Sequence, residues 1–175
     1  ALFEAKDFIA LQGRGGAAWT MVVHHLLTCG FDVEKLRHNF LIDVLVKKYG
    51  FKVKNKEDAN ITKETLPSTK TILYAPLMES WKSYGLKNFI DIPTGSTLSI
   101  LEALGQAREE GVIITELSKQ LRIKWIHPLI DRLITLDLIQ KRIVLPILKT
   151  KRNPRGCTGR TNIIHLNRFT SSYDP

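Results

Sequence analysis

Apolar residues recur at helical spacing in three stretches of the first fifty residues. Residues 2–11 form the first stretch, which Gly13 ends, and a glycine-rich turn separates it from the second. Asp32 is the expected N-cap of a third helix, which stops at Gly50. The expected buried stripe of this third helix is Val33, Leu36, Phe40 and Val44, widened by Leu41 and Leu45. Alternation of apolar and polar residues at 51–54 then predicts a short strand.

The same succession of helices begins again at Ser96. The stretch STLSILEALGQAREEG predicts a helix that Ser96 or Thr97 caps and that Gly111 closes. Thr115 is the expected N-cap of a second, shorter helix, and a third helix is predicted over 124–136. The expected inner face of this third helix consists of Ile126, Ile130 and Leu133.

Two predicted strands complete the repeated pattern. Residues 140–148 predict the first, and TNIIHL at 161–166 predicts its partner because the apolar residues alternate along it. Helix, helix, helix, strand, loop, strand is the order of a winged helix. We therefore expect a mainly α fold with small β wings (α+β), built from two winged-helix domains in tandem, a helix-turn-helix variant. The expected parts are a first winged helix at 1–55, a linker with a short helix at 56–95, and a second winged helix with a basic wing at 96–170.

The positive charge of the chain is concentrated near its C-terminal end. The 175 residues carry a net charge of +9, of which +2 falls in residues 1–140 and +7 in residues 141–175. The predicted loop between the last two strands contains no acid, and its cations are Lys149, Lys151, Arg152, Arg155 and Arg160. Such cations suit phosphate contacts, whereas the alternative is a solvated charge run. The apolar TNIIHL after the charges favours a structured arm.

The third helix of the second half carries the candidate base contacts, since a winged helix presents this helix to the DNA major groove. Its start is expected to direct Lys124, Trp125 and His127 outward, together with Asp131 and Arg132 further along. A lysine here suits guanine O6 and N7, and His127 suits a base or a phosphate. The alternative is that Trp125 packs in the core and His127 is an ordinary half-exposed residue.

The sequence gives little support for a nucleotide site, a metal site or a catalytic site. GRGGAAWT lacks the lysine of a phosphate-binding loop and lies between two helices, so it predicts a tight turn and not a nucleotide site. His24 and His25 are adjacent and therefore point to different helix faces, with no cysteine or acid at ligand spacing. No catalytic set of side chains has a recognisable context. We therefore expect no enzyme activity, no cofactor and no metal.

The cysteines and the hydropathy of the chain bear on its location. Cys29 and Cys157 are far apart and outside any CxxC motif, which favours a reducing intracellular compartment over a disulfide scaffold. No run of 18 apolar residues and no signal peptide is present, so no membrane partner is expected. The chain starts at Ala1 without methionine, which suggests a piece of a longer protein.

The stretch GVIITELSKQLRIKWIHPLIDRLITLDLIQKRIVLP, followed by GRTNIIHLNRF, resembles the B-block-binding region of the largest subunit of transcription factor IIIC. The first residues, ALFEAKDFIALQGRGGAAWTMVVHHLL, are similar to the N-terminal region of that family. Two positions depart from the family pattern, namely Asp137, where glycine is commoner, and Pro128 within the recognition helix.

The resemblance implies a function in transcription. It implies binding to double-stranded DNA at the B box, the internal promoter element of tRNA genes. The implied setting is the nucleus, in a complex with other subunits of transcription factor IIIC that recruits the RNA polymerase III machinery. The rival hypothesis is a winged-helix scaffold that binds protein partners, for which the first copy would expose Trp19 and Phe31. A bacterial-type repressor dimer is less favoured, because two copies already lie in one chain.

Overall fold

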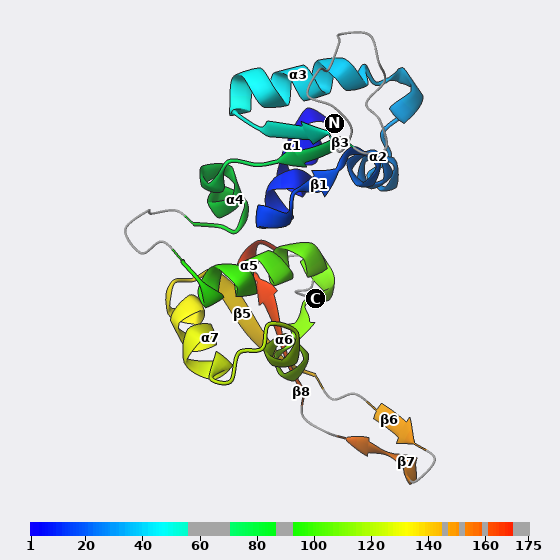
Figure 1. The fold of residues 1–175 in the computed structure, drawn as a ribbon. Coiled ribbons are helices and arrows are strands. Elements are labelled where there is room, and N and C mark those ends of the chain that lie inside the picture. Colours follow the sequence, from blue (N-terminus) through cyan, green and yellow to red (C-terminus); the bar gives the residue numbers. More distant parts are fainter. Residues whose placement is uncertain (56–70, 87–92, 145–146, 151–152, 159–160, 170–175) are drawn as a thin grey trace. The chain divides into compact units, whose positions relative to one another are not determined.

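The computed structural model describes residues 1–55, 71–86, 93–144, 147–150, 153–158 and 161–169. The chain divides into two compact units, Ala1–Ser83 and Tyr84–Pro175 (Figure 1). Both units combine helices with small antiparallel sheets, and the described part of the chain is mostly helical. Within that part, every helix falls short of the length and apolarity that a bilayer span requires.

The first unit contains a three-stranded antiparallel sheet in the order β1-β3-β2, accompanied by helices. Its elements are α1 (Leu2–Leu11), η1 (Gly13–Gly15), β1 (Ala17–Ala18), α2 (Trp19–Thr28), η2 (Val33–Lys35), α3 (His38–Tyr49), β2 (Lys52–Asn55), β3 (Thr71–Tyr74) and α4 (Leu77–Ser83). The sequence placed residues 71–83 in a linker with a short helix; in the structure α4 is a helix of that region, and β3 is the middle strand of the sheet of the first unit.

Helix α4 is fastened to α1 by polar contacts. The Lys6 ammonium lies 2.9 Å from a Glu79 carboxylate oxygen, and the Ser83 hydroxyl donates to Asp7 at 2.8 Å. The pKa of Glu79 lies below its ordinary value, chiefly because Lys82 donates a hydrogen bond to it. These contacts, together with the β3 pairing, explain why residues after the expected boundary at 55 belong to the first unit.

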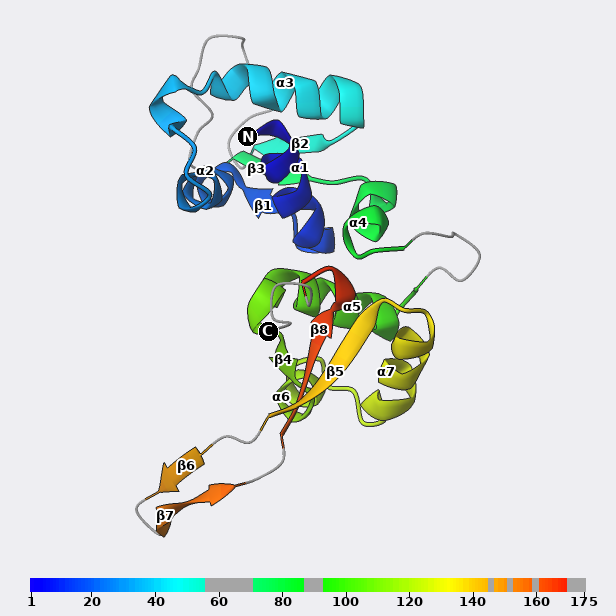
Figure 2. The same ribbon diagram turned by 180° about the vertical axis from the view of Figure 1, so that it is seen from behind.

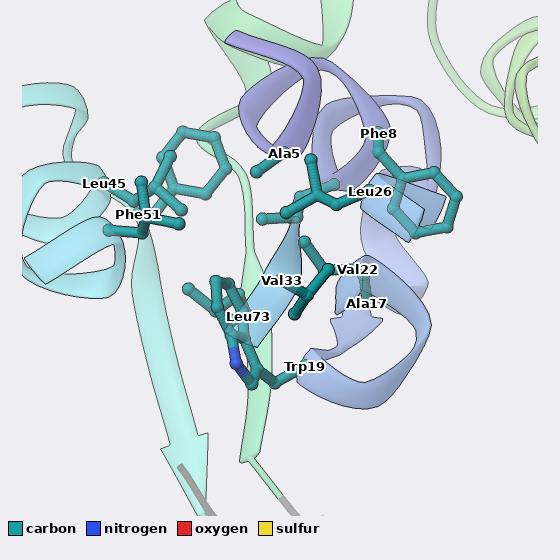
Figure 3. Close-up of a cluster of buried hydrophobic side chains, with 12 residues drawn as sticks. Ala5, Phe8, Ala17, Trp19, Val22, Leu26, Val33, Leu45, Phe51 and Leu73 are labelled. Carbon is teal, nitrogen blue, oxygen red and sulfur yellow. The ribbon is translucent and has the colours of Figure 1, made fainter. Parts of the chain in front are cut away.

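The core of the first unit collects side chains from α1, α2, α3 and β3 (Figure 3). Its members are Ala5, Phe8, Ile9, Ala17, Trp19, Val22, Leu26, Val33, Leu41, Leu45, Phe51 and Leu73. Trp19 is 3% exposed, and its indole N–H donates to the imidazole of His38 at 3.3 Å. The expectation that Trp19 lies on the surface was therefore wrong, because its side chain belongs to the buried cluster of the first unit. Phe31 packs partly buried against the same cluster.

The third helix of the first unit begins later than expected. Leu36 and Arg37 have ψ values of 129° and 85°, so η2 and α3 are separate and α3 starts at His38. The buried face of α3 is Leu41 and Leu45, whereas Phe40 is 62% exposed. The expected stripe through Phe40 was wrong because it assumed one continuous helix from Asp32.

The second unit has the same plan, with sheet order β4-β8-β5 (Figure 2). Its elements are α5 (Ser96–Ala107), η3 (Arg108–Glu110), β4 (Val112–Ile113), α6 (Ile114–Gln120), α7 (Ile126–Thr135), β5 (Ile139–Val144), β6 (Ile147–Thr150), β7 (Asn153–Thr158), β8 (Thr161–Leu166) and η4 (Asn167–Phe169). The predicted pairing of the last strand with the strand after the third helix is confirmed, since β5 and β8 pair antiparallel. Strands β6 and β7 form a separate antiparallel pair between them in the sequence.

The two units repeat one another in detail. In each, a helix and a short 3₁₀ turn lead to a glycine, a two-residue strand and the next helix. The glycines are Gly16 and Gly111, both with φ of 66°. Each lies against the central strand of its sheet, β3 or β8. The strand registers make Tyr74 and His165 equivalent, because Ala17 pairs with Leu73 as Val112 pairs with Ile164.

The repeat differs at three turns of the backbone. The first unit has glycine with positive φ at the end of α1, α2 and α3, whereas the second unit has other residues there. The pairs are Gly13 and Arg108, Gly30 and Arg122, and Gly50 and Asp137. These three are the non-glycine residues with positive φ in the described part of the chain. A side chain at such a position costs about 1–2 kcal/mol, so the second unit carries backbone strain that the first avoids.

Candidate nucleic-acid interface

Helix α7 separates an apolar face from an exposed one. Ile126, Ile130 and Leu133 are at most 3% exposed, which confirms the predicted inner face. Trp125, the N-cap residue of α7, is 82% exposed and therefore does not pack in the core. The exposed residues at the start and along this helix include Lys124, Trp125, His127, Asp131 and Arg132. The structure thus leaves each of the four predicted helix contacts exposed.

The turn before α7 fixes the start of this helix. Arg122 has φ of 54°, and the Ile123 N–H donates to the Ser118 carbonyl at 3.0 Å, which closes the end of α6. The Ser118 hydroxyl donates in return to the Ile123 carbonyl at 2.7 Å. Arg122 is exposed in this turn, next to Lys124, and sequence reasoning missed it as a candidate contact. The sequence indicated only that Arg122 lies between two predicted helices, where a turn is expected.

The end of α7 is tied to the chain that leaves β8. Asp137 has φ of 56°, and the Leu138 N–H donates to the Leu133 carbonyl at 3.1 Å. The Asn167 amide donates to the Asp137 carboxylate at 2.6 Å and to its backbone carbonyl at 2.8 Å. The departure from glycine at Asp137 therefore has a structural use, because the carboxylate joins α7 to η4.

The candidate wing lies between β5 and β8. Lys149 is in β6 and Arg155 is in β7. Lys151, Arg152 and Arg160 fall outside the described residues. At its base, β5 adds Lys141, which is exposed, and Arg142, which is half-buried. These two were counted in the basic C-terminal region but were not singled out as contacts.

The half-buried ring of His165, on β8, packs against Gly111 in the turn before β4. Its pKa lies below the ordinary 6.5, chiefly because burial penalises the charged ring and also because Arg142 is near, while a hydrogen bond with the Glu109 backbone opposes this. The ring is therefore mainly neutral at neutral pH.

A consequence of the lowered His165 pKa is pH-dependent stability. The unfolded chain takes up the proton more readily, so the free energy of unfolding of the second unit falls as pH drops below about 6.5. In the variant His165→Tyr, which copies the equivalent Tyr74, this part of the fall is expected to disappear. Urea unfolding at about pH 7.5 and about pH 5.5 measures it. An equal fall in both proteins would contradict the assignment.

The third helix of the first unit presents a different surface. Its exposed residues include Asn39, Phe40 and Asp43, with Lys47 and Lys48 in the last turn. Asp43 and Lys47 pair with each other at 3.1 Å.

One group of side chains in the first unit has ligand chemistry. The structure brings Glu4, His25 and Cys29 together, which sequence reasoning missed. The signal was present, because His25 and Cys29 are four residues apart and therefore share a helix face.

Comparison with known proteins bears on the second unit. Residues 94–172 match the family described as the B-block binding subunit of TFIIIC. The match covers α5 to η4 and confirms the resemblance found for the second half of the sequence. No curated protein matches the chain. The second unit is therefore similar, over residues 94–172, to the B-block binding subunit of TFIIIC.

Proposed function

We propose that the chain is a tandem winged-helix region that binds double-stranded B-box DNA in tRNA-gene promoters, without catalysis. The proposed setting is the nuclear TFIIIC complex, where neighbouring subunits and the RNA polymerase III machinery are its partners. The observation that carries the proposal is the outer surface of α7, where Lys124, Trp125 and His127 are exposed while the opposite face is buried.

The arrangement of elements supports the winged-helix assignment. Helices α6 and α7 are joined by a short turn, as in a helix-turn-helix, and β5 and β8 flank the β6–β7 pair as the strands of a wing would. In such domains the second helix of the pair lies in the major groove and flanking elements contact the backbone. Helix α7 would accordingly contact base edges. The pair β6–β7, here called the basic hairpin, would contact the phosphates of the DNA backbone.

Helix α7 and the basic hairpin would contribute differently to the free energy of DNA binding. Lys124 and His127 offer hydrogen-bond donors to base edges, where a good contact contributes about 1–3 kcal/mol of discrimination. The hairpin sequence offers cations without acids, which add affinity for any sequence. Arg122, exposed in the turn before α7, suits a phosphate next to the groove.

A fluorescence anisotropy titration tests the proposal with a B-box duplex and a base-scrambled duplex of equal length. The chain is expected to prefer the B box, and Lys124→Ala with His127→Ala is expected to reduce that preference by about 1–3 kcal/mol. The matched control is Lys35→Ala, an exposed lysine of η2 in the first unit, which should leave the preference unchanged. Equal affinity of the wild-type chain for both duplexes would refute sequence-specific binding.

A protein-binding scaffold is the second candidate function, and the exposed apolar residues of the first unit favour it there. Phe40 of α3 is 62% exposed and Phe3 of α1 is 70% exposed. Charge reversal at Lys151, Arg152 and Arg155 separates the two functions. Loss of DNA binding supports the DNA function, whereas retained DNA binding with loss of a TFIIIC subunit contact supports the scaffold.

A further inference from the structure

Three side chains of different chemistry converge on the surface of the first unit. The His25 Nε2 atom lies 3.8 Å from a Glu4 carboxylate oxygen and 3.5 Å from the Cys29 sulfur. All three ligand atoms lie within 4.8 Å of one another. His25 is buried, whereas Glu4 and Cys29 are exposed, so the cluster opens toward solvent on one side.

The fold holds these residues in place from two helices. His25 and Cys29 are one turn apart on α2, and Glu4 comes from α1. The Phe8 ring stacks on the imidazole with centroids 4.5 Å apart and an interplanar angle of 16°, which fixes the plane of the His25 ring. The position of Nε2 is therefore set by packing in the core of the first unit and not by the exposed side chains.

The three ligand atoms are close enough together to share one metal ion. Nε2 lies near both Glu4 and Cys29, and the Cys29 sulfur is also 3.9 Å from Nδ1, so the carboxylate and the thiol both gather around the His25 ring. Tetrahedral zinc with bonds of about 2.0–2.3 Å sets its ligand atoms about 3.3–3.6 Å apart. The two distances to Nε2 are close to this range, and the whole set lies within 4.8 Å, so small side-chain rotations would complete the site.

We propose that Glu4, His25 and Cys29 bind a zinc ion that clips α1 to α2. Thiolate, imidazole and carboxylate are zinc ligands, and the exposed side of the cluster leaves a fourth position for water. Cys29 is the C-cap residue of α2, and the partial negative charge of a helix C-terminus favours a cation there. The site lies in the first unit and is independent of the DNA function proposed for α7.

Cobalt(II) titration of the reduced 175-residue chain tests this site. The wild-type chain is expected to show the near-ultraviolet charge-transfer absorption of a cobalt–thiolate bond, which zinc then displaces. Cys29→Ser should abolish the absorption, and the matched control Cys157→Ser should retain it. Because loss of even an indirect partner weakens metal sites about 10–100-fold, Glu4→Gln is expected to weaken cobalt binding at least about tenfold.

Three results would overturn the zinc site. These are the absence of the absorption in the wild-type chain, its persistence in Cys29→Ser, and an unchanged cobalt affinity in Glu4→Gln. Both side chains are exposed, so neither substitution leaves a core cavity, and circular dichroism verifies that the variants fold. The DNA titration uses residues of the other unit, so failure of one proposal leaves the other standing.

Discussion

Raising the salt concentration from about 50 to about 200 mM is expected to weaken binding of the chain to B-box duplex roughly a thousandfold. On the proposed function, the β6–β7 hairpin and the turn before α7 would neutralise phosphates at about six contacts, and the counterions released there cause the salt dependence. The net charge of +7 in residues 141–175 supplies enough cations for this number. Anisotropy titrations over a salt series give the slope of log K against log salt concentration.

Variants of the hairpin locate these contacts. Replacing Lys151, Arg152 and Arg155 by alanine removes three cations, and each lost contact lowers the magnitude of the slope by about 0.9. Lys35→Ala, at an exposed lysine of the first unit, should keep the wild-type slope. A wild-type affinity that does not change with salt would show that phosphate contacts do not hold the complex together.

Gly111→Ala is expected to destabilise the second unit by about 3–4 kcal/mol. Gly111 has φ of 66° and ψ of −174°, a region that is essentially restricted to glycine. An added Cβ would lie 2.7 Å from the Ile164 carbonyl oxygen and would also overlap the His165 ring. The Ile164 carbonyl has little room to move, because Ile164 is a ladder residue of the central strand β8. Urea unfolding measures the loss.

A second glycine of the same unit separates strain from collision. Gly95 also has positive φ, 54°, but an added Cβ there meets no atom within 4 Å. Gly95→Ala should therefore cost only the backbone term, about 1–3 kcal/mol. Gly16→Ala in the first unit should resemble Gly111→Ala, because the Leu73 carbonyl oxygen lies 2.7 Å from the added Cβ. If Gly111→Ala cost no more than Gly95→Ala, close packing against β8 would not be the reason for this glycine.

Elements with a strong periodic pattern were predictable from sequence. The inner face of α7 followed from the spacing of Ile126, Ile130 and Leu133, and the strand 161–166 followed from its alternation. Strands β1 and β4 are only two residues long, too short for any alternation to appear. Strand β3 forms its sheet with partners distant in sequence, so its place in the first unit depends on tertiary pairing.

The candidate interface was predictable to a similar extent. Exposure of Lys124 and His127 follows from the opposite, apolar face of α7, so the pattern contained it. The contact between Asp137 and Asn167 joins residues that no periodicity relates. The same holds for Glu4 beside His25, since it depends on how α1 packs against α2.

The paired turns of the two units differ in the strain of their backbones. Where the first copy keeps glycine at the ends of its helices, the second has Arg108, Arg122 and Asp137. Two of these three add positive charge, and the third anchors the C-terminal end of α7. The first unit thus has the less strained backbone, while the second accepts backbone strain at positions where Arg122 is exposed and Asp137 holds Asn167. The turns of the first unit therefore show how the same backbone is formed with glycine, and the corresponding turns of the second unit show what a side chain at these positions adds.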